Sequence, residues 1–208
     1  MFNIYNSEAI QNMDKDFRTQ LINNVSGFKS ANLIGTISRN QLTNLAIFSS
    51  IVHLGANPAL IAIISRPFAE GVSRHTYNNL TETGFYTINH VGTSFTDKAH
   101  QTAARYDSET SEFMAVGLTE QFIDGFPAPF VAESNIKIGL RYLQTIDIEL
   151  NNTKMVIGEI QIIIAPTACI LPDGRLDLIK ANTAAVSGLD TYHSANFINT
   201  YPYAKVKK

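Results

Sequence analysis

Two hydrophobic patterns divide the chain near residue 30. Between residues 14 and 24, Phe17, Leu21 and Ile22 lie four and one positions apart among charged residues. This spacing predicts a short amphipathic helix that ends at Gly27. From residue 30 onward, apolar and β-branched residues dominate segments that are separated by turn signals at residues 39–41 and 55–58. The pattern predicts three successive strands, over residues 31–38, 44–53 and 58–65.

The same reading continues through the rest of the chain. Ser73 is a suitable N-cap for a short helix that ends at Gly84. A second helix over residues 94–106 would align Phe95, Ala99 and Tyr106 on one face. Further strands are expected at residues 85–91, 136–150, 154–165 and briefly around Leu176, with a turn at residues 172–174. Because helices do not alternate regularly with strands, we predict a mainly β fold, a closed antiparallel β-barrel with added helices, rather than a doubly wound sheet.

Composition limits the classes of function. The chain has 208 residues and no internal repeat or linker, so we expect one domain over residues 1–208 with a frayed C-terminal tail. Its apolar character excludes a disordered protein. A net charge of −2 gives no basic face for a nucleic acid partner. Charged residues make up only 16% of the chain, which predicts that another subunit covers part of the surface.

The sequence also gives expectations for compartment and metals. The first residues lack the pattern of a signal peptide, and the apolar run at residues 60–64 is far shorter than the roughly 20 residues that span a bilayer. We therefore expect a cytoplasmic protein with no membrane partner. The single cysteine, Cys169, excludes a disulfide framework and lies in an apolar context typical of a buried residue. The five histidines are widely spread, so we expect no metal site.

Two segments carry candidate chemistry, although the chain has no dinucleotide fingerprint, phosphate loop or nucleophile elbow. Alternate residues of a strand face opposite sides, so Ser49 and Ser50 cannot both be core residues. At the predicted helix start, free backbone N–H groups, the Arg74 guanidinium and the Thr76 hydroxyl would together bind a phosphate. A polar barrel rim and a capped helix explain the same residues without a ligand.

Several stretches, in order, match a known family. They are Lys29–Thr36, Asn44–Ser50, His53–Pro58, Arg66–Pro67, Arg74–Asn79, Thr83–Val91, Lys98–Ala103 and Ser187–His193. On these stretches, from about residue 17 to 193, the chain resembles the flavin reductase-like family with the FMN-binding split-barrel fold, and its flavoredoxin-like members in particular. The resemblance implies a homodimer that holds FMN non-covalently near the subunit interface. It assigns no catalytic side chain.

The resemblance also implies the cofactor contacts. They are Asn44, Leu45, Ala46, Phe48, Ser49 and Ser50 along the flavin, with Arg74, His75 and Thr76 at the phosphate. Arg66 is a further cofactor contact or, equally, a structural arginine at the rim. The motif at residues 187–193 either reaches the site or has a structural role at the interface. His75 stands where an aspartate is common in the family, which predicts a pH-sensitive phosphate pocket.

The implied activity is that of an oxidoreductase that accepts a hydride from NADH or NADPH as co-substrate. It would pass the electrons to free flavin, a partner monooxygenase or a metal chelate. FMN carries this chemistry, while the protein binds and orients it, and backbone N–H groups of residues 45–50 would stabilise the reduced ring. The alternatives are a non-catalytic flavin-binding electron carrier or redox sensor and, more weakly, an interaction module without cofactor. His53, His100 and His193 are each either a proton donor to the flavin or a hydrogen-bonded structural histidine.

Overall fold

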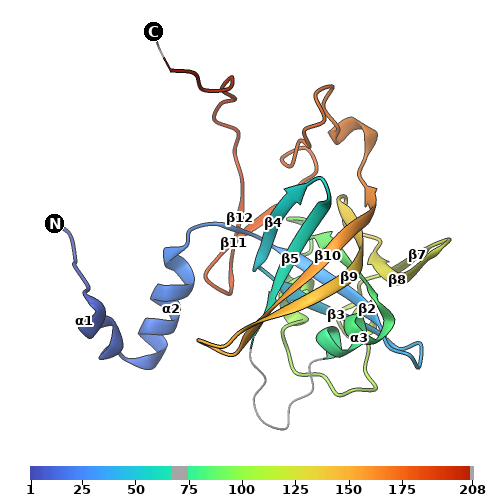
Figure 1. The fold of residues 1–208 in the computed structure, drawn as a ribbon, viewed down its shortest axis with the longest axis horizontal. Coiled ribbons are helices and arrows are strands. Elements are labelled where there is room, and N and C mark those ends of the chain that lie inside the picture. Colours follow the sequence, from blue (N-terminus) through green and yellow to red (C-terminus); the bar gives the residue numbers. More distant parts are fainter. Residues whose placement is uncertain (67–74, 207–208) are drawn as a thin grey trace.

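A seven-stranded antiparallel sheet forms the centre of the computed structural model, which describes residues 1–66 and 75–206 (Figure 1). Its strands follow the order β3-β2-β6-β9-β10-β5-β4. Their bounds are β2 (Asn32–Ile37), β3 (Thr43–Phe48), β4 (Ile51–Ala56), β5 (Ala59–Ser65), β6 (Phe85–His90), β9 (Lys137–Ile148) and β10 (Thr153–Ile164). The fold is mainly β, as predicted.

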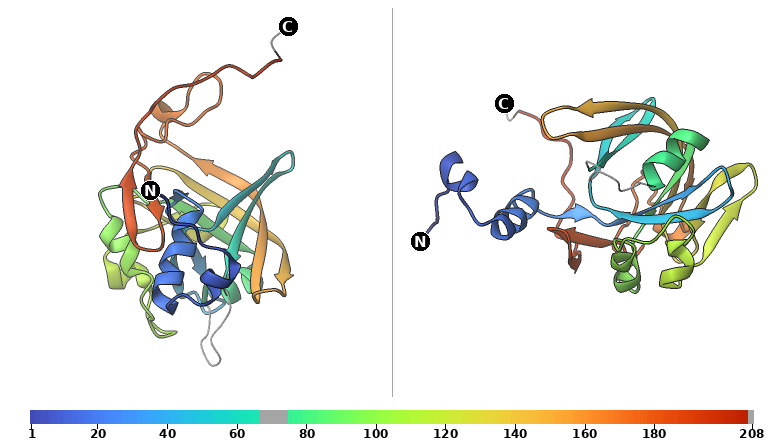
Figure 2. Two further views of the ribbon diagram at one scale, coloured as in Figure 1. Left: turned by 90° about the vertical axis from the view of Figure 1, so that its left-hand side faces the viewer. Right: turned by 90° about the horizontal axis from the view of Figure 1, so that it is seen from below.

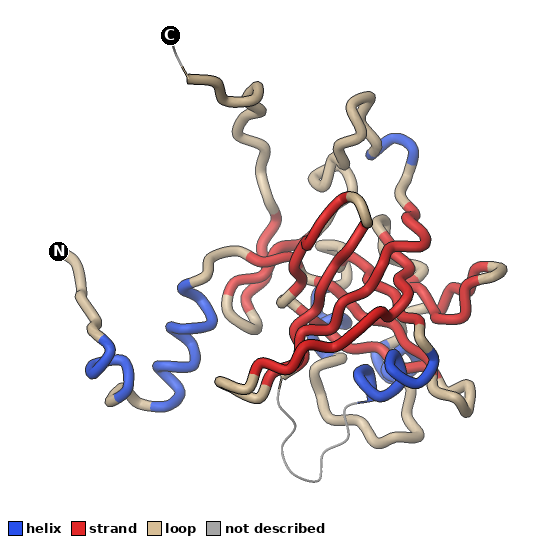
Figure 3. Tube along the Cα trace, in the orientation of Figure 1, coloured by secondary structure: helices blue, strands red, loops and turns tan. Residues whose placement is uncertain are grey.

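Smaller elements surround this sheet (Figures 2 and 3). A three-stranded sheet combines β1 (Lys29–Ser30), β11 (Ala184–Ser187) and β12 (Thr191–Ser194), and β7 (Glu120–Ile123) pairs with β8 (Phe126–Val131). The helices are α1 (Ser7–Gln11), α2 (Lys15–Val25), α3 (His75–Thr83), α4 (Thr96–Gln101), α5 (Glu112–Val116) and the 3-10 turn η1 (Thr167–Cys169). None of the helices in the described part of the chain is long and apolar enough to cross a membrane.

The expectation of a closed barrel is wrong. The seven-stranded sheet ends at β3 on one side and at β4 on the other, and these two strands are not hydrogen-bonded to each other. The prediction of a single strand over residues 44–53 is also wrong. This segment forms two strands, β3 and β4, which Ser49 and Ser50 join. At this corner the chain leaves its pairing with β2, and the Ser50 carbonyl accepts from the Ile64 N–H at 3.0 Å on β5. The two serines therefore bridge the split in the sheet.

Helix predictions hold best where local signals are strong. The helix predicted over residues 14–24 is α2, and the Asp14 carboxylate, which sequence reasoning did not single out, caps it by accepting from the Phe17 N–H at 3.0 Å. Gly84 follows α3 with a φ of +79°, and ends this helix as predicted. The proposed N-cap Ser73 lies outside the described residues. The helix predicted over residues 94–106 is shorter, since α4 covers only Thr96–Gln101 and the chain then turns. The Thr102 hydroxyl, 2.8 Å from the Ala99 carbonyl, donates into this turn.

Two large groups of buried side chains stabilise the fold. One lies between the sheet and α3 and contains Ile34, Ile63, Leu80, Tyr86, Ile88, Leu140 and Val156. The other includes Leu33, Leu45, Val91, Phe95, Phe113 and Val131, and it binds α4 and α5 to the sheet. Cys169 is buried and unpaired, as expected. In contrast, α1 and α2 project from the barrel and bury no residue (Figure 1).

Candidate functional site

A cavity of about 670 Å³ opens where the sheet is split. Its walls come from β3 and the Ser49–Ser50 corner, the end of β5, the start of α3, the segment at residues 102–106, α5 and β11–β12. Its volume lies within the range of roughly 300–1,000 Å³ that small-molecule and cofactor sites occupy. A smaller cavity of about 420 Å³ lies on the other side of Asn44 and His75, which line both.

The two candidate segments of the sequence meet in this cavity. Asn44 on β3 donates from Nδ2 to the Thr76 Oγ1 at 3.0 Å, across a sequence separation of 32 residues. The same amide donates to Thr36 Oγ1 at 3.3 Å. His75 and Thr76 begin α3 and line the cavity together with Ser49 and Ser50. Hydroxyl groups and the positive end of a helix dipole therefore face one space, which is the environment that favours a phosphate.

Cationic side chains at the rim of the cavity also favour a phosphate. Arg66 and Arg105 line the cavity, and no carboxylate in the described chain forms an ion pair with either of them. Lys29 lies close by, and partial burial followed by the positive charge of Arg66 lowers the pKa of Lys29 below its ordinary value. Positive charges without paired carboxylates stabilise a bound dianion.

The remaining wall is apolar and ends at an unpaired strand edge. Ala46, Ile47, Phe48, Val186 and Leu189 line it. Because β3 pairs with β2 and with no other described strand, alternate backbone groups of β3 point away from the sheet, and Glu112 binds one of them, the Leu45 N–H. An apolar wall beside a strand edge whose backbone groups are not all hydrogen-bonded to another strand suits a flat heteroaromatic ring that carries both donors and acceptors.

Glu112 is the one buried carboxylate among the described cavity residues. Its Oε2 accepts from the Leu45 N–H at 2.9 Å, which fixes α5 against the outer edge of β3. Burial raises the pKa of Glu112, against the opposing effects of the Leu45 N–H and the nearby His75. Sequence reasoning did not identify Glu112, because no motif surrounds it and its partner lies 67 residues away.

The structure gathers most of the predicted site residues. Those that line the cavity are Asn44, Ala46, Phe48, Ser49, Ser50, Arg66, His75 and Thr76. Leu45 does not line it, because its side chain is buried in the core and its N–H is bound to Glu112. Arg74 lies outside the described residues. Of the motif at residues 187–193, Leu189 and Tyr192 reach the cavity of their own chain.

The three candidate proton donors lie outside the lining of this cavity. His53 is exposed on β4. His193 hydrogen-bonds Ser187 Oγ at 2.9 Å and packs edge-to-face on Phe28. His100 hydrogen-bonds the Tyr192 hydroxyl at 3.2 Å. Burial, with the neighbouring Asp190, raises the pKa of Tyr192 to about 12, so this cavity-lining phenol stays protonated at neutral pH.

Comparisons with known proteins agree with this geometry. The flavin reductase like domain matches residues 26–168. A solved structure from Shewanella frigidimarina NCIMB 400, assigned as a flavin reductase with a split barrel domain, is 44% identical, with a TM-score of 0.93 over 98% of this chain and 100% of that chain. Component B of nitrilotriacetate monooxygenase from Bacillus cereus is 18% identical, with a TM-score of 0.82 over 97% and 98%. Flavoredoxin from Desulfovibrio vulgaris (Miyazaki F) is 21% identical, with a TM-score of 0.72 over 85% and 92%. No curated protein matches the chain.

Fold and site define a split-barrel protein of the flavin-related oxidoreductase class. The chain belongs to the flavin reductase-like family, which confirms the resemblance seen in the sequence. The lining fits FMN by its chemistry, since it combines serine and threonine hydroxyls, the start of α3, two arginines with no carboxylate partner among the described residues, and apolar side chains beside the outer edge of β3.

Proposed function

We propose that the protein is an FMN-dependent oxidoreductase that uses NADH or NADPH as co-substrate. The observation that carries this proposal is the convergence of the Ser49–Ser50 corner and the start of α3 on one cavity, with the Asn44–Thr76 hydrogen bond between them. Two segments far apart in sequence, each suited to a mononucleotide, thus form one site.

Each group of residues then has a separate task. Ser49, Ser50 and Thr76 hold the phosphate with the N-terminal end of α3, and Arg66 supplies charge at the rim. Ala46 and Phe48 bind the ring, while the outer edge of β3 pairs with its polar side. When bound, FMN supplies the two-electron chemistry. The protein binds and orients the ring and leaves one face open to the nicotinamide, which requires no catalytic side chain.

The acceptor of the electrons is a small molecule, such as free flavin or a metal chelate, or a partner oxygenase. The name of the Bacillus cereus relative, component B of a monooxygenase, supports the last of these. We further propose that the working form is a homodimer in the cytoplasm.

Binding is tested by titrating the protein with FMN and following flavin fluorescence. Arg66→Ala should weaken binding by about 1.5–3 kcal/mol, the range for a hydrogen bond to a charged group. Arg39→Ala is the matched control, because Arg39 is exposed and does not line the cavity. A wild-type protein that takes up no FMN would reject the proposal, and equal affinities of all three proteins would reject the role of Arg66.

Turnover is tested by mixing the FMN-loaded protein with NADH or NADPH under anaerobic conditions in a stopped-flow instrument. Loss of the flavin absorbance band on the timescale of turnover supports an oxidoreductase. A stable band with both nucleotides would favour the electron carrier or redox sensor instead.

A further inference from the structure

The outer edge of β3, the side that faces away from β2, presents a fixed set of backbone groups. The Leu45 N–H lies on this edge, because it bonds to Glu112 rather than to β2. Backbone groups alternate in direction along an antiparallel strand, so those of Thr43 and Ile47 lie on the same edge. From the β2–β3 turn towards the Ser49–Ser50 corner, the outer edge therefore presents Thr43, then Leu45, then Ile47.

The start of α5 is bonded to the first two of these residues. Thr43 Oγ1 donates to Glu120 Oε1 at 2.5 Å and lies 2.7 Å from Ser111 Oγ in a second hydrogen bond. One position further along α5, Glu112 Oε2 accepts from the Leu45 N–H at 2.9 Å. The side chains of Thr43, Ser111 and Glu112 are all buried. Two consecutive residues at the start of α5 thus close the outer edge of β3 as far as Leu45.

This closure stops before Ile47, which lines the main cavity. No strand in the described part of the chain pairs with β3 on its outer edge. In an antiparallel strand the N–H and C=O of one residue point in the same direction, so Ile47 offers a donor and an acceptor side by side. Glu112 lines the same cavity. The carboxyl group that occupies the Leu45 N–H therefore borders the space into which a ligand of Ile47 would fit.

A donor and an acceptor side by side on a strand edge bind a group with the complementary pattern. A peptide strand has this pattern when it adds to the edge of a sheet. A cyclic imide has it as well, because its N–H lies between two carbonyl groups, and the flavin ring of FMN carries such an imide edge. The Ile47 N–H would donate to an imide carbonyl, and the Ile47 C=O would accept from the imide N–H.

A free Leu45 N–H would compete with Ile47 for the same ring. The two residues are about 7 Å apart along the strand, so the ring could bind at either of two positions. Glu112 removes the second position by occupying the Leu45 N–H. Burial raises the pKa of Glu112, which shows that its charged form is disfavoured there. An apolar side chain would avoid this penalty but would leave the Leu45 N–H without a partner.

We propose that Glu112 is a positioning residue for the flavin ring: by occupying the Leu45 N–H it holds the outer edge of β3 and leaves the N–H and C=O of Ile47 to bind the imide edge of the ring. This inference rests on the proposed function in taking FMN as the ligand. It adds the position of the ring along β3 and the residue that sets this position.

The test compares FMN with N3-methyl-FMN, in which a methyl group replaces the imide proton, by fluorescence titration of the full-length protein. In the wild type, methylation should raise the dissociation constant by roughly tenfold or more, because the hydrogen bond to the Ile47 C=O is lost. Glu112→Ala should raise the dissociation constant of FMN by roughly tenfold and that of N3-methyl-FMN by less than about threefold. The methylated ring has already lost the contact that Glu112 positions, so the two changes are not additive.

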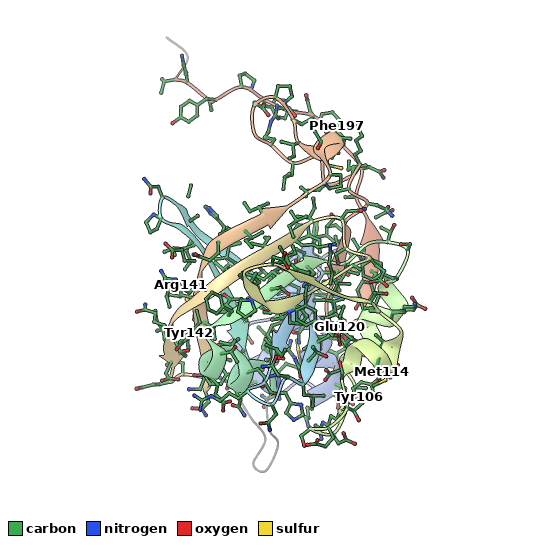
Figure 4. The ribbon with its side chains drawn as sticks, turned by 90° about the vertical axis from the view of Figure 1, so that its right-hand side faces the viewer. Tyr106, Met114, Glu120, Arg141, Tyr142 and Phe197 are labelled. Atoms are coloured by element: carbon green, nitrogen blue, oxygen red, sulfur yellow. The ribbon has the colours of Figure 1, made fainter. Side chains whose placement is uncertain are left out.

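Three further variants separate the hydrogen bond from charge and from packing. Glu112→Asp keeps the charge but is one carbon too short for the Leu45 N–H, so it should behave as Glu112→Ala does and replaces it if the alanine variant does not fold. Glu112→Gln keeps an acceptor and should stay within about twofold of wild type with both flavins. Met114→Ala is the control on the same helix, because Met114 is 79% exposed and does not line the cavity. Figure 4 shows Met114 on the surface of α5.

The outcomes separate this inference from the proposed function. If Glu112→Ala and Glu112→Asp weaken FMN and N3-methyl-FMN by the same factor, Glu112 has a structural role only and the inference is overturned, while the proposed function stands. A wild type that binds FMN and N3-methyl-FMN equally well also overturns the inference alone. A wild type that takes up neither flavin refutes the inference and the proposed function together.

Discussion

The packed and the hollow halves of the barrel differ at one buried polar group, the hydroxyl of Tyr86. In the packed half, between the sheet and α3, Tyr86 is fully buried and its hydroxyl has no hydrogen-bond partner among the described residues. Around the cavity, Asn44 is bonded to Thr76 and Glu112 is bonded to the Leu45 N–H. An unsatisfied buried hydroxyl costs about 1–3 kcal/mol, so the packed half tolerates a loss of stability that the hollow half avoids.

The difference shows what each half requires. At Tyr86 the packed half needs the volume of the ring, which fills its space whether or not the hydroxyl has a hydrogen-bond partner. The hollow half must hold its side chains in place around a space, without close packing to fix them. Hydrogen bonds such as Asn44–Thr76 supply this positioning.

The largest expected effect on stability comes from a substitution that disrupts the close packing around Tyr86. In Gly158→Ala on β10, the new Cβ would lie 2.8 Å from Cζ of Tyr86 and closer still to its hydroxyl. We expect a loss of about 3 kcal/mol in the free energy of unfolding, at the upper end of the usual cost of overpacking. Urea denaturation measures it.

The control for this variant is Gly55→Ala on β4. There the nearest heavy atom to the added Cβ is the Pro58 carbonyl oxygen, at an ordinary contact distance of 3.5 Å. We expect a change within about 0.5 kcal/mol, as for other surface substitutions. Equal losses in the two variants would show that the Tyr86 contact is not what makes Gly158 necessary.

A smaller effect of opposite sign comes from Tyr86→Phe. Removing the unpaired hydroxyl should raise the free energy of unfolding by about 1 kcal/mol. Tyr142→Phe is the matched control, since the Tyr142 hydroxyl is hydrogen-bonded to Thr145 Oγ1 at 3.0 Å, and its removal should lower stability by about 0.5–1.5 kcal/mol. Thermal and urea unfolding of both variants measure the difference. If Tyr86→Phe is the less stable of the two variants, the unpaired Tyr86 hydroxyl does not cost the protein stability.

The sequence could predict the elements that depend on local patterns, but not those that depend on strand pairing. The strands β2, β5, β6, β9 and β10 follow from local patterns, because each is a run of apolar residues bounded by turn signals. The break between β3 and β4 could not be predicted from local patterns, because serines such as Ser49 and Ser50 are compatible with a continuous strand. The hydrogen bond from the Ile64 N–H on β5 to the Ser50 carbonyl marks the change of pairing. Strand β8 was missed because Pro127 and Pro129 argue against a strand.

The candidate site was predictable only as far as its residues lie in short motifs. The Asn44–Ser50 and His75–Thr76 segments could be identified before their convergence was known. Glu112 could not be identified from the sequence, because its role depends on its hydrogen bond with the distant Leu45 N–H, which only the tertiary fold creates. The helix α2 was predicted correctly from the spacing of Phe17, Leu21 and Ile22, but that spacing does not show what its apolar side chains contact, and no residue of α2 is buried in this chain.

The smallest expected effect concerns Glu112, the buried group of the hollow half that titrates. Burial raises its pKa in the folded protein above the ordinary value of an unfolded chain. Between these two values the folded state binds more protons than the unfolded state, so the contribution of Glu112 to stability is greatest below the ordinary pKa and falls as pH rises through this window. Glu112→Gln keeps an acceptor for the Leu45 N–H but removes the charge, and its effect at low pH should stay within about 1 kcal/mol. Urea unfolding from about pH 4 to about pH 8 should therefore show the variant gaining stability relative to wild type as pH rises. Parallel curves for the two proteins would mean that the pKa of Glu112 is the same in the folded protein and in the unfolded chain, so that burial does not outweigh the opposing effects of the Leu45 N–H and His75.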